Sequence, residues 1–194
     1  VKLNTNESPF PPSPKVLKAI NRAEILKLNL LLNTQLNGLT IEEIRRGIES
    51  LETIRGRFKM IETDKFLVVD DCYNANPVSM MASIDVLSQA KGRKIAVLGD
   101  MGELGSEEKK LHGMVGTHFA GKKIDALFVT GTLAGEIAEE ARRVAPETRV
   151  YAEPDKEALA QALLDCRRPG DTILVKASHF MGFSEIVKKL EQPQ

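Results

Sequence analysis

From residue 57 onward, short apolar runs alternate with longer amphipathic stretches, and this alternation restricts the fold more than any other feature of the sequence. Continuous apolar runs such as Ile173-Leu174-Val175 are typical of strands that are covered on both faces. The pattern predicts an α/β protein with a mostly parallel sheet of about six strands and helices on both faces. We expect strands at residues 57–62, 66–71, 94–100, 126–130, 149–152 and 172–176, and helices at 77–90, 106–120, 132–145, 155–166 and 184–190.

The first 53 residues follow a different pattern. Residues 1–14 contain four prolines and are therefore expected to form an extended arm, because proline suits neither a helix interior nor a central strand. A helix is expected over residues 14–36, and a second one opens at a capping box formed by Thr40 and Glu43. The predicted organisation is an arm and helix start in residues 1–23, a helical segment in 24–53 and the α/β domain in 54–194.

Composition argues against several functional classes. Lys plus Arg and Asp plus Glu both number 27, and a net charge of zero does not suit a nucleic-acid binder that relies on bulk electrostatics. No apolar run reaches the roughly 18 residues of a membrane span, and the polar first residues do not resemble a signal peptide. Two cysteines make no disulfide framework, and His112 and His118 are wrongly spaced for a helical metal pair. We expect a cytoplasmic protein with no nucleic-acid, membrane or metal partner.

Ligands of parallel sheets bind beyond the carboxyl ends of the strands, so the residues that follow each expected strand are the candidates. Asp70 and Asp71 end the second strand, and Asn76-Pro77 then has the usual chemistry of a helix start. Successive strand residues point to opposite faces, so only one of the two aspartates can face a given site. A carboxylate in this position can accept hydrogen bonds from ribose hydroxyls, and the alternative is a solvated turn.

Other segments at the same edge carry charge or glycine. Lys176 and Ser178 follow the last strand and suit an anion or carboxylate site, with a surface lysine beside a polar turn as the alternative. Arg55-Gly56-Arg57 suits phosphate binding, and surface solubility explains it equally well. The glycine-rich loop at residues 99–105 matches neither GxGxxG nor the P-loop GxxxxGK[ST], so we interpret it as a turn.

Four segments together resemble the C-terminal domain of the Mur ligases. The similarity runs from about residue 37 to about residue 190, and it is greatest to the members that add D-alanyl-D-alanine to UDP-N-acetylmuramoyl-tripeptide in peptidoglycan precursor synthesis. The segments are Gly56-Arg57, Asp71-Cys72-Tyr73-Asn74-Ala75-Asn76-Pro77, Gly99-Asp100-Met101-Gly102-Glu103-Leu104-Gly105 and Leu174-Val175-Lys176-Ala177-Ser178.

The resemblance implies a Rossmann-like domain that closes over ATP and receives the incoming dipeptide. The family's N-terminal domain holds the UDP-sugar peptide, and its central domain carries the P-loop and the magnesium ligands. Because this sequence has no P-loop, the resemblance implies no catalytic residue, no bound ATP and no magnesium site on this chain alone. The family roles carry over to nucleotide binding at Arg57 and Asp71, the closing interface at Asn74 and Asn76, and dipeptide placement at Lys176 and Ser178. His179 stands where the family usually has arginine.

Residues 1–23 resemble a different family, the N-terminal arm of the histidinol-phosphate aminotransferases. The rest of that fold is absent, so no pyridoxal phosphate is expected. Residues 24–53 resemble a helical remnant of the ligase central domain, and the simplest interpretation is a chimera. Its uncovered apolar helix is expected to pack against the arm or a second copy of the chain. Two functions stay open. The chain is either a ligase domain that is inactive alone, or a non-catalytic folding or assembly module that could form a homodimer.

Overall fold

The computed structural model describes residues 56–192. These residues belong to the second of the two units into which the chain divides, which begins at residue 53. The expected arm, the two expected N-terminal helices and Arg55 lie outside the described residues.

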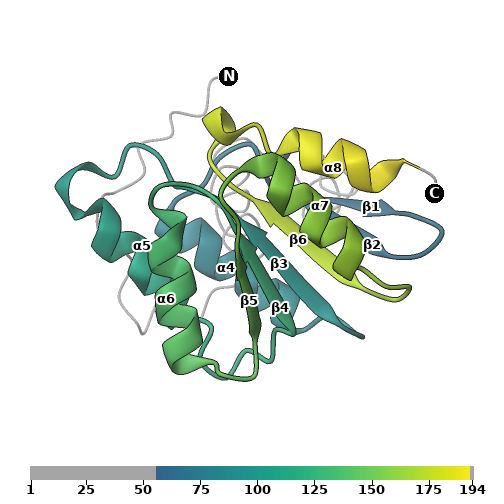
Figure 1. The fold of residues 1–194 in the computed structure, drawn as a ribbon, viewed down its shortest axis with the longest axis horizontal. Coiled ribbons are helices and arrows are strands. Elements are labelled where there is room, and N and C mark those ends of the chain that lie inside the picture. The colour runs from purple at the N-terminus through teal and green to yellow at the C-terminus, as the bar shows by residue number, and fades with distance from the viewer. Residues whose placement is uncertain (1–55, 193–194) are drawn as a thin grey trace, which may run out of the picture. The chain divides into compact units, whose positions relative to one another are not determined.

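Six strands form a single sheet in the order β1-β2-β6-β3-β4-β5 (Figure 1). β1 runs antiparallel to β2, and every other neighbouring pair is parallel. The predicted mostly parallel sheet of six strands is therefore confirmed. The strands are β1 (Lys59–Glu62), β2 (Leu67–Asp70), β3 (Lys94–Leu98), β4 (Ala126–Val129), β5 (Arg149–Ala152) and β6 (Thr172–Lys176).

Helices cover both faces of the sheet, and each face has its own apolar core (Figure 1). Alternate residues of β6 enter the two cores: Leu174 packs on one side, while Ile173 and Val175 pack on the other. One face carries α4 (Pro77–Ser88), α5 (Glu108–Thr117) and α6 (Ala134–Val144), and the other carries α7 (Lys156–Cys166) and α8 (Ser184–Glu191).

The observed elements differ from the predicted ones mainly at their ends. The helix expected from residue 106 begins instead with a 3-10 turn, Gly105–Glu107, before α5. Gly105 has a φ of 66°, outside the right-handed helical region, so regular helical geometry can begin only after it. A second 3-10 turn, His179–Met181, connects β6 to α8.

α5 and α6 pack closely because a glycine lies at their contact. A Cβ atom added to Gly116 would lie 2.4 Å from the carbonyl oxygen of Ile137. Gly135, in the first turn of α6, has no atom within 4 Å of the corresponding position. The two helices can therefore keep this spacing only while residue 116 has no side chain.

We expect Gly116→Ala to lower the free energy of unfolding by about 2 kcal/mol, because the helices must separate to admit the methyl group. Gly135→Ala is the matched control, and it should leave stability unchanged or raise it by up to about 1 kcal/mol. Urea unfolding followed by circular dichroism measures both changes. Equal stability of the two variants would contradict the close packing.

Candidate functional site

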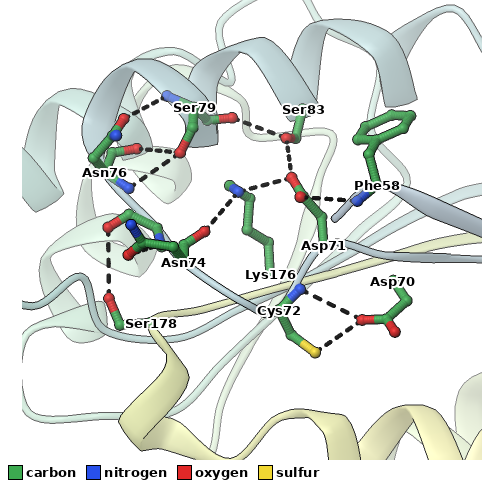
Figure 2. A network of polar contacts seen from close by, with 11 residues as sticks. Phe58, Asp70, Asp71, Cys72, Asn74, Asn76, Ser79, Ser83, Lys176 and Ser178 are labelled. Carbon is green, nitrogen blue, oxygen red and sulfur yellow. Dashed lines mark hydrogen bonds and ion pairs between the residues drawn. The ribbon is translucent and has the colours of Figure 1, made fainter. Parts of the chain in front are cut away.

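The carboxyl ends of β2, β6 and β3 meet at one edge of the sheet. Asp70 of β2 pairs with Val175 of β6, and Leu98 of β3 pairs with Lys176, so the three strands end at nearly the same level. The loops that follow these strands carry most of the candidate residues, and Figure 2 shows their polar contacts. We call this region the carboxyl edge.

A buried ion pair lies at the centre of the carboxyl edge. The Nζ atom of Lys176 lies 2.7 Å from Oδ2 of Asp71, and the two side chains are 1% and 5% exposed. The same Nζ atom donates a hydrogen bond of 3.0 Å to the carbonyl oxygen of Asn74 (Figure 2). A charge in the protein interior needs such partners. The alternative of a surface lysine is therefore wrong.

Asp71 also binds two other parts of the fold. Its Oδ1 accepts the backbone N–H of Phe58 at 3.1 Å, and its Oδ2 accepts the hydroxyl of Ser83 at 2.8 Å. The carboxylate thus joins β6, α4 and the turn before β1 (Figure 2). The alternative of a solvated turn is also wrong, because Asp71 is buried and both of its oxygens already accept hydrogen bonds.

Asp70 points to the other face of the sheet, as strand alternation predicts. Its Oδ2 accepts the backbone N–H of Gly56 at 2.9 Å, and its Oδ1 accepts the thiol of Cys72 at 2.8 Å. Burial and the adjacent carboxylate of Asp70 hold the pKa of the Cys72 thiol well above its ordinary value. The thiol therefore stays protonated and acts as a hydrogen-bond donor.

The two aspartates together hold the turn that carries Arg57. Gly56 and Phe58, on either side of it, have φ angles of 78° and 54°. A left-handed conformation is costly for a phenylalanine and persists only where neighbouring contacts impose it. Here Asp70 binds the N–H of Gly56, Asp71 binds that of Phe58, and the Gly56 carbonyl accepts the N–H of Tyr73 at 2.9 Å.

The glycine-rich loop (residues 99–105) is held by three consecutive residues. The carboxylate of Asp100 accepts backbone N–H groups at the start of α6, where Ala134 donates at 2.7 Å. The N–H of Met101 donates to Nε2 of His112 at 2.9 Å, and the N–H of Gly102 donates to the hydroxyl of Ser178 at 2.8 Å. The predicted turn is therefore held in one conformation by these hydrogen bonds.

His112 is fully buried. Its Nε2 accepts a hydrogen bond, so Nδ1 carries the proton and donates to the Glu108 carbonyl at 2.7 Å. Sequence analysis missed this role and the capping role of Asp100, whose partners at the start of α6 lie more than thirty residues away. The sequence indicated a special role for His112 only through its place on a helix face that is otherwise apolar.

The remaining candidate residues face solvent or cap a helix. Asn76 caps α4, with its side chain accepting the N–H of Ser79 and Pro77 in the first turn, as the sequence predicts. Asn74 and Arg57 are exposed. The guanidinium of Arg57 lies 4.3 Å from the centre of the half-exposed Tyr73 ring, an arrangement that orients the cation.

The ring of His179 lies near this pair, with its centre 5.7 Å from that of Tyr73 in an edge-to-face arrangement. A pocket of about 130 Å³ lies beside the two rings, with Asp70 on its polar side and Phe183 and Val187 on its apolar side. The exposed chemistry of the carboxyl edge is thus a cation on an aromatic ring next to a small pocket. Such a surface suits an anion or a planar group.

Metal binding and membrane insertion find no support in the part of the chain that the structure describes. Across residues 56–192, no three His, Cys, Asp or Glu side chains gather closely enough to hold an ion. None of the helices in this range has the length and apolar character that crossing a bilayer requires.

We expect Lys176→Met to lower the free energy of unfolding by about 3–5 kcal/mol, because it leaves the buried Asp71 charge without its cation. Lys176→Met combined with Asp71→Asn should recover part of this loss, since the buried charge is then gone. Lys110→Met breaks an exposed ion pair with Glu107 and is the control, with little change expected. Similar unfolding midpoints for Lys176→Met and Lys110→Met would contradict the buried pair.

Cys72 should resist alkylation in the folded protein, because its thiol is buried, protonated and bound to Asp70. In Cys166→Ser, which leaves this single thiol, we expect labelling by iodoacetamide at roughly pH 8 to be about 100-fold slower than in urea. Mass spectrometry over time measures the rate. The reverse variant, Cys72→Ser, gives the labelling rate of the half-buried Cys166. If Cys72 were labelled faster than Cys166 in the folded protein, the prediction would be refuted.

Comparisons with known proteins agree with this geometry. Residues 56–179 match the sequence profile of the family described as "Mur ligase, glutamate ligase domain". The UDP-N-acetylmuramoyl-tripeptide–D-alanyl-D-alanine ligase of Bacillus subtilis is 38% identical over 79% of this chain, and that of Escherichia coli is 32% identical over 80%. Both alignments cover 34% of the relative, so the chain spans about a third of the length of these curated proteins.

Solved structures show the same similarity. A MurF ligase from Thermotoga maritima in complex with ADP aligns with a TM-score of 0.68 and 30% identity, over 83% of this chain and 36% of the other. A MurF structure from Acinetobacter baumannii aligns with a TM-score of 0.69 and 28% identity, over 84% and 36%. The matched residues include every loop of the carboxyl edge up to His179. The chain therefore belongs to the Mur ligase family, and residues 56–179 form its glutamate ligase domain.

Proposed function

We propose that this chain supplies the domain of a Mur ligase that closes over ATP during the addition of D-alanyl-D-alanine to UDP-N-acetylmuramoyl-tripeptide. The names of the curated relatives and the ADP-bound relative support this assignment. The observation that carries it is the Arg57 turn, which both strand-end aspartates hold at the carboxyl edge. The P-loop, the magnesium ligands and the site for the UDP-sugar peptide then belong to the rest of such a ligase.

The reaction needs a cation that is placed accurately at a phosphate. In the proposed reaction, ATP phosphorylates the tripeptide carboxylate, and the amine of the dipeptide attacks the resulting acyl phosphate. Arg57 is the exposed cation at the carboxyl edge whose backbone and side chain are both held, the former by Asp70 and Asp71 and the latter by Tyr73. We assign Arg57 to the phosphates of ATP, since a guanidinium binds phosphate oxygens in pairs.

The buried residues contribute in a different way. Asp71, which the resemblance assigns to the ribose, has both oxygens engaged and acts in the proposal by fixing Phe58 and thereby the Arg57 turn. Lys176, which the resemblance assigns to the dipeptide, neutralises Asp71 and fixes the carbonyl of Asn74. They are positioning residues, whereas Arg57 meets the ligand.

The loops after β2 and β6 complete the proposed closing interface. Asn74 presents its side chain at the exposed surface, and Asn76 begins α4 directly behind it. Ser178 connects the glycine-rich loop to the loop after β2, because its hydroxyl accepts from Gly102 and lies 3.5 Å from the Ala75 carbonyl oxygen. In the proposal, the domain closes on its ligand with three loops that hydrogen bonds hold in fixed positions relative to one another.

A hybrid enzyme tests the proposed function. Residues 56–194 replace the matching C-terminal third of the Bacillus subtilis ligase, and ATP-dependent addition of D-alanyl-D-alanine to UDP-N-acetylmuramoyl-tripeptide is measured. We expect the hybrid to be active. We expect Arg57→Ala to lower its kcat/KM on the order of 100-fold, as loss of a preorganised charge at a reacting phosphate does.

Lys91→Ala is the matched control, because this exposed cation lies before β3, at the other end of the strands. It should leave kcat/KM unchanged. A folded hybrid without activity, or equal effects of the two substitutions, would refute the proposal. The 194-residue chain alone should show no ATP hydrolysis, since its sequence has no P-loop.

A further inference from the structure

The strand order of the sheet indicates where a ligand should bind. β6 and β3 are neighbours, but the chain leaves them toward opposite faces, since β3 leads to α5 on one face and β6 leads to α8 on the other. Ligands of open α/β sheets bind beyond the carboxyl ends of two strands that diverge in this way. The glycine-rich loop follows β3 and the 3-10 turn His179–Met181 follows β6, so these two segments flank that position.

Phe180 in this 3-10 turn has its ring in solvent. The side chain is 68% exposed, more than any other large apolar side chain that the structure describes. One edge of the ring lies against Gly102 of the glycine-rich loop, because a Cβ atom added to that glycine would be 3.0 Å from a ring carbon. The ring therefore rests on the loop that follows the neighbouring strand, and most of its surface remains accessible.

The fold holds Phe180 in this exposed position. The N–H of Met181 donates to the carbonyl oxygen of Ser178 at 3.0 Å, and the hydroxyl of the same serine accepts the N–H of Gly102. Phe183, three residues after Phe180, is fully buried in the core and anchors the other end of the turn. The exposure of the ring is thus a property of a turn that is fixed on both sides.

The surroundings of Phe180 distinguish it from other exposed apolar residues. Single apolar side chains on a surface are common, and Val86 in the last turn of α4 is an example. Phe180, however, directly follows His179, whose ring lies 5.7 Å from that of Tyr73. Tyr73 in turn carries the guanidinium of Arg57. The exposed ring therefore belongs to the same surface as the cation that we assign to phosphate.

The reaction proposed above includes an intermediate that water can destroy. In the productive step the dipeptide nitrogen bonds to the acyl carbon, the bond from that carbon to the phosphate oxygen breaks, and a proton of the amine passes to solvent as phosphate leaves. Attack of water on the same carbon gives back the tripeptide carboxylate and releases phosphate, so ATP is consumed without ligation. Closed active sites prevent such hydrolysis by excluding water.

We propose that Phe180 covers the acyl phosphate when the domain closes and keeps water away from it while the dipeptide attacks. The inference rests on the proposed ligase function and adds to it a residue with a separate task. Arg57 contributes charge at the phosphate, whereas Phe180 contributes an apolar surface and exchanges no proton. The held turn places this surface outside the core before closure begins.

The hybrid enzyme described above tests this role, with phosphate release and dipeptide addition measured in the same reaction. The unsubstituted hybrid should release one phosphate for each dipeptide added. We expect Phe180→Ala to raise this ratio to roughly two to five, most strongly at low dipeptide concentration, where water competes best. Phe180→Leu keeps an apolar side chain and should bring the ratio back to nearly one. Val86→Ala is the matched control, because it shortens an exposed apolar side chain on α4, and it should leave the ratio at one.

The ratio distinguishes a shield from a merely structural role, since a destabilised domain loses phosphate release and dipeptide addition together. A ratio of one for Phe180→Ala in an active hybrid would overturn the inference and leave the proposed function standing. Equal uncoupling by Val86→Ala would overturn it as well. An unsubstituted hybrid that folds but is inactive would overturn both the proposed function and the inference that rests on it.

Discussion

The ion pair of Lys176 and Asp71 is the interaction on which the carboxyl edge depends. An ammonium group with 1% of its side chain exposed is tolerated only beside a carboxylate, and this carboxylate must itself be held. Asp71 is held by Ser83 of α4 and by the N–H of Phe58, so one buried charge sets the position of a strand, a helix and a turn. The exposed Arg57 occupies its place because of contacts made below the surface.

The parallel sheet, its helical layers and the cap of α4 could be predicted from the sequence, since each follows from local information. Apolar runs such as Ile173-Leu174-Val175 encode strands that are buried on both faces. Asn76-Pro77 encodes a helix start, because the cap involves only residues that are close in the chain. Element ends were less predictable. The 3-10 turn before α5 starts at Gly105, which has the left-handed conformation, and the sequence pattern did not predict this turn.

The candidate site was only partly predictable, because its main contacts join residues that are far apart in the chain. Lys176 meets Asp71 across 105 residues, and Asp100 caps α6 across more than thirty. Sequence analysis predicted ligand roles for several polar groups, and the structure shows that the fold also uses these groups for internal contacts. Asp71, Lys176 and Ser178 are all buried, while the exposed group of Arg57, Tyr73 and His179 became evident only in three dimensions.

The place of β6 has a consequence for synthesis of the protein. β6 is the last strand in the sequence, yet it lies between β2 and β3, which do not pair with each other. Until residues 172–176 have left the ribosome, the β1-β2 hairpin and the β3-β4-β5 half have no ladder to join them, and Asp71 has no cation. A nascent chain therefore exposes two unpaired strand edges until residue 176 has emerged, and such edges are sites at which unfinished chains aggregate.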